Sequence, residues 1–525
     1  MKHRDVPLYP FLLAAYPILQ LSAENVEWLV SWKDLGISVA MSLIVAGLGF
    51  VLVPRFLGHR RSEATILWVL FWLWYGIFVQ LLVRLTGRPA LFLYSFALPL
   101  WILVIVAGGA VFRPRDWLKR AKPFLNLFSV FLLLFPIIAH LRGSSTRLPP
   151  TDSANLLSHR VVAPPESLPD IYFLILDGYS GTQSLAQVRN YDNRPFEDSL
   201  RQRDFVVPNR SRANYIHTHL SLASMLNWTH LLNLKSVAGD GHDRSLTHNM
   251  IEDNRAARFL RTLGYEFVFF PTTFPATVQN RLADRQIPEP PLRESNLHLI
   301  WFWQSAAAPL IPLLCWAVDC QPKRFPYPPE TTREFEAKFT RLAALAEEPG
   351  PKFILAHLLL PHPPFIFQAD CTPRDPIWPV SGDPTAQSGE RSSYLDQIDC
   401  LNRMLLPLID QILEGSDHSP IIILQADHGS GRIHLDPLTG ETIPLEELDQ
   451  VQIDDRSYLF AAYHLPDGGG ALVYDSITPV NILPLVFNHY FGTDIQPLED
   501  ATYWSEYRQS YVFTRIQTRS SNPRQ

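Results

Sequence analysis

Two apolar stretches of this 525-residue chain each end in polar residues that could bind a metal ion. Residues 171–176 form an uninterrupted apolar run that ends at Asp177, and residues 420–424 form another that leads to Asp427 and His428. Such runs are typical of buried parallel strands, whose carboxyl ends border the ligand crevice of an open α/β sheet. One aspartate alone more often only caps a loop. Because the pattern recurs at two strand ends, we expect a site for a divalent cation such as Zn, Mn or Mg.

A hydroxyl group that could act as a nucleophile lies between these two stretches. Thr218 precedes a segment in which Leu222 and Leu226 have the spacing of a buried helix face. At a helix N-terminus a hydroxyl faces unpaired amides and the positive end of the helix dipole, where an anionic group is readily received. The alternative is a threonine that only caps the helix, which is the commoner case for such a residue in isolation.

The chain from residue 168 onward is expected to position these groups on a mostly parallel central sheet. Short apolar runs alternate there with helical patterns, which is typical of a doubly wound α/β domain. Three segments without a clear period, 235–249, 284–329 and 370–390, are predicted to be loops or insertions over the sheet. The other predicted strands are 205–207, 267–270 and 353–360, and the predicted helices are 195–203, 251–262, 331–347, 394–413 and 478–490.

The N-terminal third is predicted to be a membrane anchor of about five helices, because it holds five apolar segments near the length that spans a bilayer. Basic residues gather in alternate loops, although Arg84 and Arg88 dilute the bias. The positive-inside rule then places the C-terminal part outside the cytoplasm. We therefore expect an anchor at 1–141, a linker at 142–167 and an extracytoplasmic catalytic domain at 168–525. The five segments are residues 6–21, 37–53, 64–83, 90–112 and 123–139.

The charge and the cysteine content limit the kinds of partner that the chain can have and the cellular compartment in which it can lie. Residues 1–147 carry 15 Lys and Arg against 6 Asp and Glu, which leaves 30 against 45 for the remainder. An acidic globular part argues against nucleic acid as a partner. All four cysteines lie in this part, and none has the CxxC spacing of a structural zinc site. Cys371 and Cys400 flank an irregular segment and are predicted to form a disulfide, the alternative being that Cys400 is a buried thiol.

Asp177 after an apolar strand, Thr218 at a helix start and the run Ala426–Gly429 together resemble the alkaline phosphatase and sulfatase superfamily. Within it, an anchor of five spans before an outer catalytic domain is similar to lipoteichoic acid synthases and phosphoethanolamine transferases. The resemblance covers roughly residues 168–492 through short motifs. It implies that Asp177, Thr218, Asp427 and His428 bind one divalent metal ion, and that Thr218 is the nucleophile.

Four histidines lie near these motifs, and the sequence predicts different roles for them. In the relatives, a substrate-binding histidine precedes an aromatic residue, which implies that His362 contacts the phosphate or protonates the leaving group. His357 lies within the preceding strand and is expected to be a packed residue. His217 and His219 flank the nucleophile, and the sequence leaves open whether they act in function or only contribute polarity.

The chain also departs from sulfatases in two respects. The run Thr218–Leu222 lacks the Cys-x-Pro-x-Arg type of motif, which disfavours sulfate ester hydrolysis by the usual route. Gly178 follows Asp177 where sulfatases and phosphatases tend to carry more acidic ligands, which favours a single metal ion. We therefore expect a membrane enzyme that transfers a phosphoryl-linked headgroup from a lipid or cell-envelope substrate through Thr218. The alternatives are a hydrolase of the same superfamily (sulfatase, phosphodiesterase or phosphatase) and a non-catalytic tethered binding domain.

Overall fold

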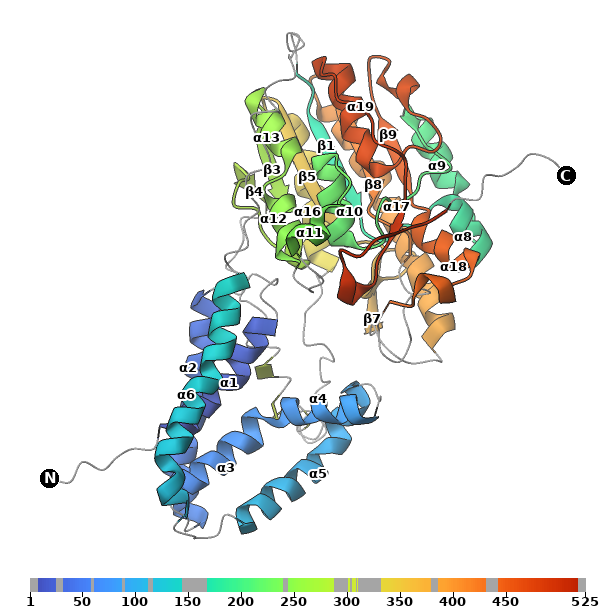
Figure 1. The fold of residues 1–525 in the computed structure, drawn as a ribbon. Coiled ribbons are helices and arrows are strands. Elements are labelled where there is room, and N and C mark those ends of the chain that lie inside the picture. The colour runs from blue at the N-terminus through green and yellow to red at the C-terminus, as the bar shows by residue number, and fades with distance from the viewer. Residues whose placement is uncertain are drawn as a thin grey trace. The chain divides into compact units, whose positions relative to one another are not determined.

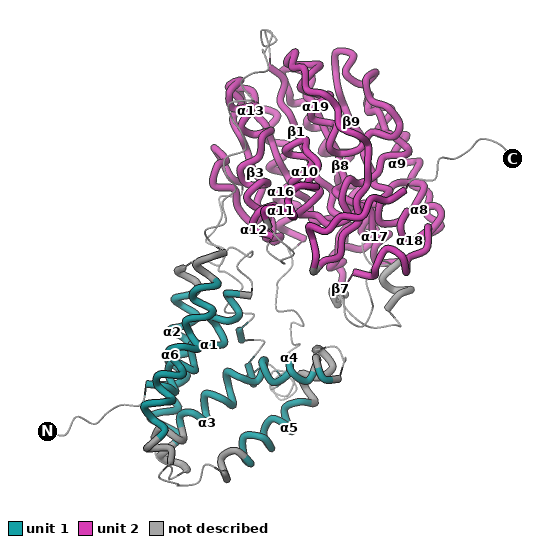
Figure 2. The backbone as a smooth tube through the Cα atoms, viewed as in Figure 1, with its two compact units in different colours: residues 1–146, 292–328 teal, residues 147–291, 329–525 magenta. Residues whose placement is uncertain are grey.

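The computed structural model divides the chain into two compact units (Figure 1, Figure 2). Unit 1 comprises Met1–Thr146 and Leu292–Pro328, and unit 2 comprises Arg147–Pro291 and Pro329–Gln525. The residues that the structure describes are 8–24, 32–57, 61–86, 90–111, 117–143, 168–238, 244–287, 301–302, 305–307, 309, 332–378, 386–430 and 442–517.

Unit 1 is helical, and each of the five apolar segments predicted from the sequence contains a helix. The predicted span 64–83 is interrupted at Trp74, so it forms two helices that are each too short to cross a bilayer alone. By length and composition, Leu35–Val53 and Ala121–Ala139 are suited to cross a membrane. Five crossings therefore remain a prediction. The helices are α1 (Tyr9–Glu24), α2 (Trp32–Leu57), α3 (Arg61–Leu73), α4 (Tyr75–Thr86), α5 (Ala90–Val111) and α6 (Trp117–Gly143).

A segment from the second half of the chain also packs into unit 1. Trp301 is buried in one apolar cluster with residues of α1, α2 and α3, and Ala306 is buried in another with residues of α4 and α5. The Ala306 amide donates to the carbonyl of Trp72 at 3.1 Å. The prediction that residues 284–329 lie over the sheet is therefore wrong for 301–302 and 305–307. Trp301 and Ala306 are buried among the N-terminal helices instead.

Unit 2 contains a seven-stranded sheet with the strand order β2-β9-β8-β1-β5-β3-β4. The five strands from β8 to β4 run parallel, whereas β9 and β2 pair antiparallel at one edge. This arrangement confirms the predicted α/β class with a mostly parallel central sheet. The strands are β1 (Ile171–Leu176), β2 (Phe205–Val206), β3 (Glu266–Phe270), β4 (Arg285–Gln286), β5 (Lys352–Leu358), β8 (Ile421–Ala426) and β9 (Ala461–His464).

The register of the central strands brings the two predicted aspartates together. Leu176, the last residue of β1, lies opposite Ala426 of β8 and Leu358 of β5. Asp177 and Asp427 therefore leave adjacent parallel strands at the same level. The strands themselves are fully buried, as expected for a parallel sheet covered on both faces.

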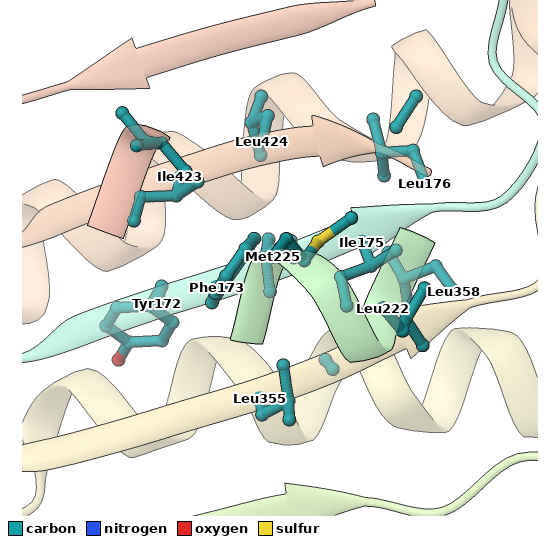
Figure 3. Packing of buried hydrophobic residues seen from close by; sticks show 14 of the residues in the cluster. Tyr172, Phe173, Ile175, Leu176, Leu222, Met225, Leu355, Leu358, Ile423 and Leu424 are labelled. Carbon is teal, nitrogen blue, oxygen red and sulfur yellow. The ribbon is translucent and has the colours of Figure 1, made fainter. Parts of the chain in front are cut away.

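Helices cover the sheet, and α10 packs directly on its central strands. Figure 3 shows Leu222 and Met225 of α10 against Phe173 and Ile175 of β1. α10 also contacts α12, α13 and α19, while α16 packs against α17. The helices are α8 (Thr182–Arg189), α9 (Arg194–Arg201), α10 (Thr218–Asn227), α11 (Leu234–Ala238), α12 (Ser245–Glu252), α13 (Arg255–Thr262), α16 (Thr332–Ala344), α17 (Ala386–Gly415), α18 (Gln450–Ser457) and α19 (Pro479–Phe491).

Besides residues 284–329, which include β4, two other segments predicted to be loops contain regular structure. Residues 235–249 include most of α11 and the beginning of α12, whose buried side chains pack against α10. Residues 370–390 include β7 (Pro373–Trp378), which pairs with β6 (Phe365–Phe367), and the first turn of α17. Both errors arise where tertiary contacts stabilise short elements that have no periodic apolar pattern of their own. The predicted disulfide between Cys371 and Cys400 is present and joins this hairpin to α17.

Candidate active site

Asp177 lies at the end of β1, where it is 2% exposed. Its amide donates to the Leu358 carbonyl at 3.0 Å, which continues the pairing of β1 with β5 by one residue. Gly178 follows with a φ of 71°, a left-handed conformation that glycine adopts without strain. The chain thereby turns so that the Gly178 amide donates to Oδ1 of Asp427 at 2.9 Å. One glycine thus links the two carboxylate loops.

The hydrogen bonds of His428 determine which tautomer its ring adopts. Its Nδ1 lies 2.8 Å from the Gly429 carbonyl, which can only accept, so Nδ1 carries the proton. Burial lowers the pKa of His428 well below its ordinary value, and the imidazole is therefore neutral. Its Nε2 then has a free lone pair, which lies 3.0 Å from the hydroxyl of Thr218 and 3.1 Å from Oδ2 of Asp427.

Thr218 is the first residue of α10, as its predicted role requires. His217 precedes the helix with extended backbone angles, and its side chain makes no capping hydrogen bond. The Thr218 hydroxyl donates to Nε2 of His428, because that nitrogen is unprotonated. Unlike residues 219–227, which are all buried, Thr218 is partly exposed. It therefore combines a fixed hydroxyl position with access for a substrate.

The donor set fits a divalent cation. Ligand atoms of Asp177, Asp427 and His428 lie within 4.8 Å of one another. Oδ1 of Asp177 and Oδ2 of Asp427 are buried without a hydrogen-bond partner among the described residues. Oδ2 of Asp427 and Nε2 of His428 face each other as two acceptors at 3.1 Å, a contact that a cation between them would make favourable. Two carboxylates and a neutral imidazole are suitable ligands for Zn or Mn.

The two carboxylates titrate as a coupled pair. Burial raises the pKa of Asp427 to about 7, and the negative charge of Asp177 contributes to the increase. Burial also opposes ionisation of Asp177, but His362 and His357 hold the pKa of Asp177 below its ordinary value. A bound cation would favour the ionised form of both carboxylates.

The structure brings two histidines to this centre, His357 of β5 and His362, which follows this strand. Atoms of His362 lie 3.9 Å from the position that a Cβ on Gly178 would take, so its ring borders the Asp177 loop. Nε2 of His357 lies 3.2 Å from Oδ2 of Asp177, while its Nδ1 contacts the hydroxyl of Thr277 at 2.9 Å. His357 is fully buried, as expected of a packed histidine, and its ring also faces a site carboxylate. His357 lies opposite Ile175, two residues before Asp177, and only the pairing of β5 with β1 shows this.

His217 and His219 are both buried, which excludes the reading that they only add polarity to the surface. Nε2 of His217 donates to the Ser505 carbonyl at 2.9 Å, and Nδ1 of His219 lies 2.9 Å from the hydroxyl of Thr247. Burial lowers the pKa of both rings, to about 3 for His217. They are neutral neighbours that fix the first turn of α10 to the segments around it.

Arg456 also lies at the site, although the sequence did not single it out. Its guanidinium is buried beside the site and donates to the carbonyls of Ile216 and Gly429. Burial lowers the pKa of Arg456 to about 10, so it remains charged at neutral pH. An arginine at the end of a short polar helix has no sequence signal that distinguishes it from a surface residue.

Neither the family models nor the curated proteins searched contain a match to the sequence. Similar solved structures include the C-terminal periplasmic domain of EptC from Escherichia coli in complex with Zn, at 12% identity and a TM-score of 0.41, covering 66% of this chain and 93% of that one. The integral membrane protein lipooligosaccharide phosphoethanolamine transferase A (EptA) from Neisseria meningitidis matches at 11% identity and a TM-score of 0.38, covering 91% and 94%. Phosphonate monoester hydrolase of Agrobacterium radiobacter matches at 15% identity and a TM-score of 0.38, covering 64% and 80%. Similarities of this extent assign no activity to the chain.

Proposed function

We propose that the chain is a membrane-anchored, metal-dependent phosphotransferase of the alkaline phosphatase and sulfatase superfamily. The observation that carries this proposal is the position of the Thr218 hydroxyl, 3.0 Å from Nε2 of His428 at the beginning of α10. The adjacent carboxylates have buried oxygens without a partner among the described residues. A partly exposed hydroxyl beside a set of metal ligands is what covalent phosphoryl transfer requires.

Different residues of the chain would carry out different parts of the reaction. Asp177, Asp427 and His428 would hold one divalent cation, with Thr218 as the fourth ligand. When bound, the cation would lower the pKa of the Thr218 hydroxyl and neutralise charge on the phosphoryl group. The positive end of α10 lies where that group must arrive.

Transfer would proceed in two displacements at phosphorus. Thr218 Oγ1 releases its proton to solvent and forms a bond to phosphorus, while the bond between phosphorus and the donor's leaving oxygen breaks. His362, which borders the Asp177 loop, would contact the phosphoryl group and supply the proton that the leaving oxygen needs. An acceptor hydroxyl then gives its proton to the deprotonated His362 and attacks the phosphothreonine, and the Thr218 oxygen leaves and regains a proton from solvent. If water takes the place of the acceptor, the same site is a hydrolase.

The donor is proposed to be a membrane lipid or cell-envelope molecule, and the catalytic unit is proposed to lie on the extracytoplasmic side. Two apolar helices of sufficient length support membrane anchoring by their length and composition. The five-span topology, the anchor at residues 1–141 and the catalytic domain at 168–525 are part of this proposal. The charge distribution of the loops supports the orientation.

The direct test is to incubate the purified protein with membrane lipids and measure the mass of the peptide that contains Thr218. We expect an adduct of a phosphoryl-linked headgroup, which Thr218→Ala abolishes together with turnover. Thr218→Ser should keep partial activity because the hydroxyl survives. Thr340→Ala is the matched control, since Thr340 is exposed on α16 and bonds only to the Glu336 carbonyl among the described residues. Turnover by Thr218→Ala at the wild-type rate would refute the covalent route.

Metal content tests the other half of the proposal. Replacing Asp177, Asp427 or His428 by alanine should remove the bound cation while circular dichroism stays close to wild type. The ligands lie beyond the strand ends, so the packed sheet does not depend on them. Full metal occupancy in Asp427→Ala would show that the cation is held elsewhere. His362→Ala should impair substrate use and leave the metal in place.

A further inference from the structure

One buried guanidinium joins the two segments that carry the candidate nucleophile and the metal-binding histidine. Nε of Arg456 donates to the Ile216 carbonyl at 2.8 Å, and Nη2 donates to the same oxygen. Nη1 donates to the Gly429 carbonyl at 3.2 Å. Ile216 lies two residues before Thr218, and the Gly429 carbonyl is the acceptor that sets the tautomer of His428. The planar fork of arginine can hold both carbonyls in one geometry.

The main chain around Arg456 contacts the same loops. The Gly429 amide donates to the Arg456 carbonyl at 2.9 Å. The Ala213 amide, in the segment that leads to α10, donates to the Ser457 carbonyl at 2.8 Å. The Gly181 amide, after the Asp177 loop, donates to the Tyr458 carbonyl at 3.1 Å. The end of α18 is therefore bonded to all three segments that supply candidate ligands.

The side chain before Arg456 fixes this end of α18 in place. Asp455 is 1% exposed and forms a two-point ion pair with Arg189 of α8. It also accepts from the hydroxyl of Ser184 at 2.6 Å. Arg456 therefore projects from a segment that cannot easily shift, which is the property needed in a residue that orients others.

The charge of Arg456 has no direct carboxylate partner among the residues that the structure describes. A buried arginine usually forms an ion pair, because an uncompensated charge is costly in a medium of low dielectric. The negative charges that favour its protonated form are chiefly Asp427 and then Asp177. The guanidinium thus offsets part of the negative charge of the carboxylate pair while it holds the carbonyls.

We propose that Arg456 is a positioning residue. Through the Ile216 and Gly429 carbonyls it holds Thr218 and His428 in a fixed position relative to each other. This inference rests on the proposed function of the same site. Without Arg456, the His428 ring loses the fixed carbonyl that orients Nε2, and the start of α10 is released from the 427–429 loop. Residues that orient metal ligands typically contribute 10–100-fold to metal affinity or activity.

The experiment compares Arg456→Met, Arg456→Lys and Arg212→Met in the full-length protein in detergent. Arg212 is the matched control, because it also contacts the end of α18, with its guanidinium over Tyr458 and paired with Asp454. Zn²⁺ affinity is measured by titration of the metal-free protein. The absorption spectrum of bound Co²⁺ reports ligand geometry, which a residue with only a general stabilising role would not change.

We expect Arg456→Met to lower Zn²⁺ affinity by about 10–100-fold and to alter the Co²⁺ spectrum. Formation of the Thr218 adduct should slow by a similar factor, with the decrease in kcat rather than in KM. Arg456→Lys retains the charge but not the fork, so it should recover only part of the affinity. Arg212→Met should match the wild type in affinity and spectrum.

Each outcome decides one of the two proposals. Wild-type Zn²⁺ affinity and Co²⁺ spectrum in Arg456→Met would overturn the inference about Arg456 alone. Unfolding of both Arg456 variants, with a stable Arg212→Met, would also overturn it, because Arg456 would then stabilise the fold rather than orient ligands. Absence of Zn²⁺ binding and of a Thr218 adduct in the wild-type protein would instead refute the proposed function.

Discussion

Gly429 offers a test of how the site is held, because it has no room for a side chain. A methyl carbon at this position would lie 2.1 Å from the Asp455 carbonyl oxygen and 2.6 Å from that of Tyr458. The shorter contact is about 1.3 Å less than the 3.4 Å at which ordinary contact begins. Both oxygens belong to the main chain, so no flexible side chain can move aside. Gly429→Ala must therefore displace the metal-binding loop or the end of α18.

The free-energy change follows from three effects. Overpacking of a well-packed region typically costs about 1–3 kcal/mol. Loss of the hydrogen bond from the Gly429 amide to the Arg456 carbonyl adds about 0.5–1.5 kcal/mol. The reduced entropy of the unfolded chain returns about 0.4–1 kcal/mol. We expect a net destabilisation of about 2 kcal/mol, with a 10–100-fold loss of Zn²⁺ affinity because His428 moves with its neighbour.

Thermal denaturation and Zn²⁺ titration of the full-length protein measure the two effects. Gly264→Ala is the matched control, since Gly264 has a φ of 91° and open space around it. Its cost of about 1–2 kcal/mol comes from the left-handed backbone alone, so it should lower stability without changing metal affinity. Gly429→Ala with wild-type stability and affinity would show that the contacts between α18 and the 427–429 loop do not hold the site.

Three further predictions concern other parts of the molecule. Cys371→Ser should lower stability by about 3–4 kcal/mol, the entropy cost of opening a loop of 29 residues; thiol counting under denaturing, non-reducing conditions should find Cys371 and Cys400 blocked, and two additional reactive thiols would exclude the bond. A reporter that is active only outside the cytoplasm should give a signal when fused to the C-terminus and none when fused within residues 113–122, and the reverse pattern would contradict the orientation. Trp301→Ala should lower the melting temperature of the protein because Trp301 is buried against α1, α2 and α3; an unchanged melting temperature would mean that this segment does not anchor to unit 1.

The candidate site was largely predictable because its residues stand at marked positions in the sequence. Asp177 and Asp427 each follow an apolar run that is typical of a buried strand, and Thr218 opens a segment with a clear helical face. Local sequence specifies such strand ends and helix starts, so the residues that could do chemistry there can be recognised without the tertiary structure. The α/β class followed from the same alternation of elements. The roles assigned to these residues remain proposals.

The contributions of His357 and Arg456 came only from the tertiary structure. His357 faces Asp177 because β5 pairs with β1 in a particular register, and no local pattern encodes the register of strands so far apart in the chain. Arg456 reaches Ile216 and Gly429 because α18 ends against both segments. The packing of Trp301 in unit 1 also depends on which apolar surface is available to cover it. Sequence identified the groups that could do the chemistry, whereas long-range packing decided what holds them in place.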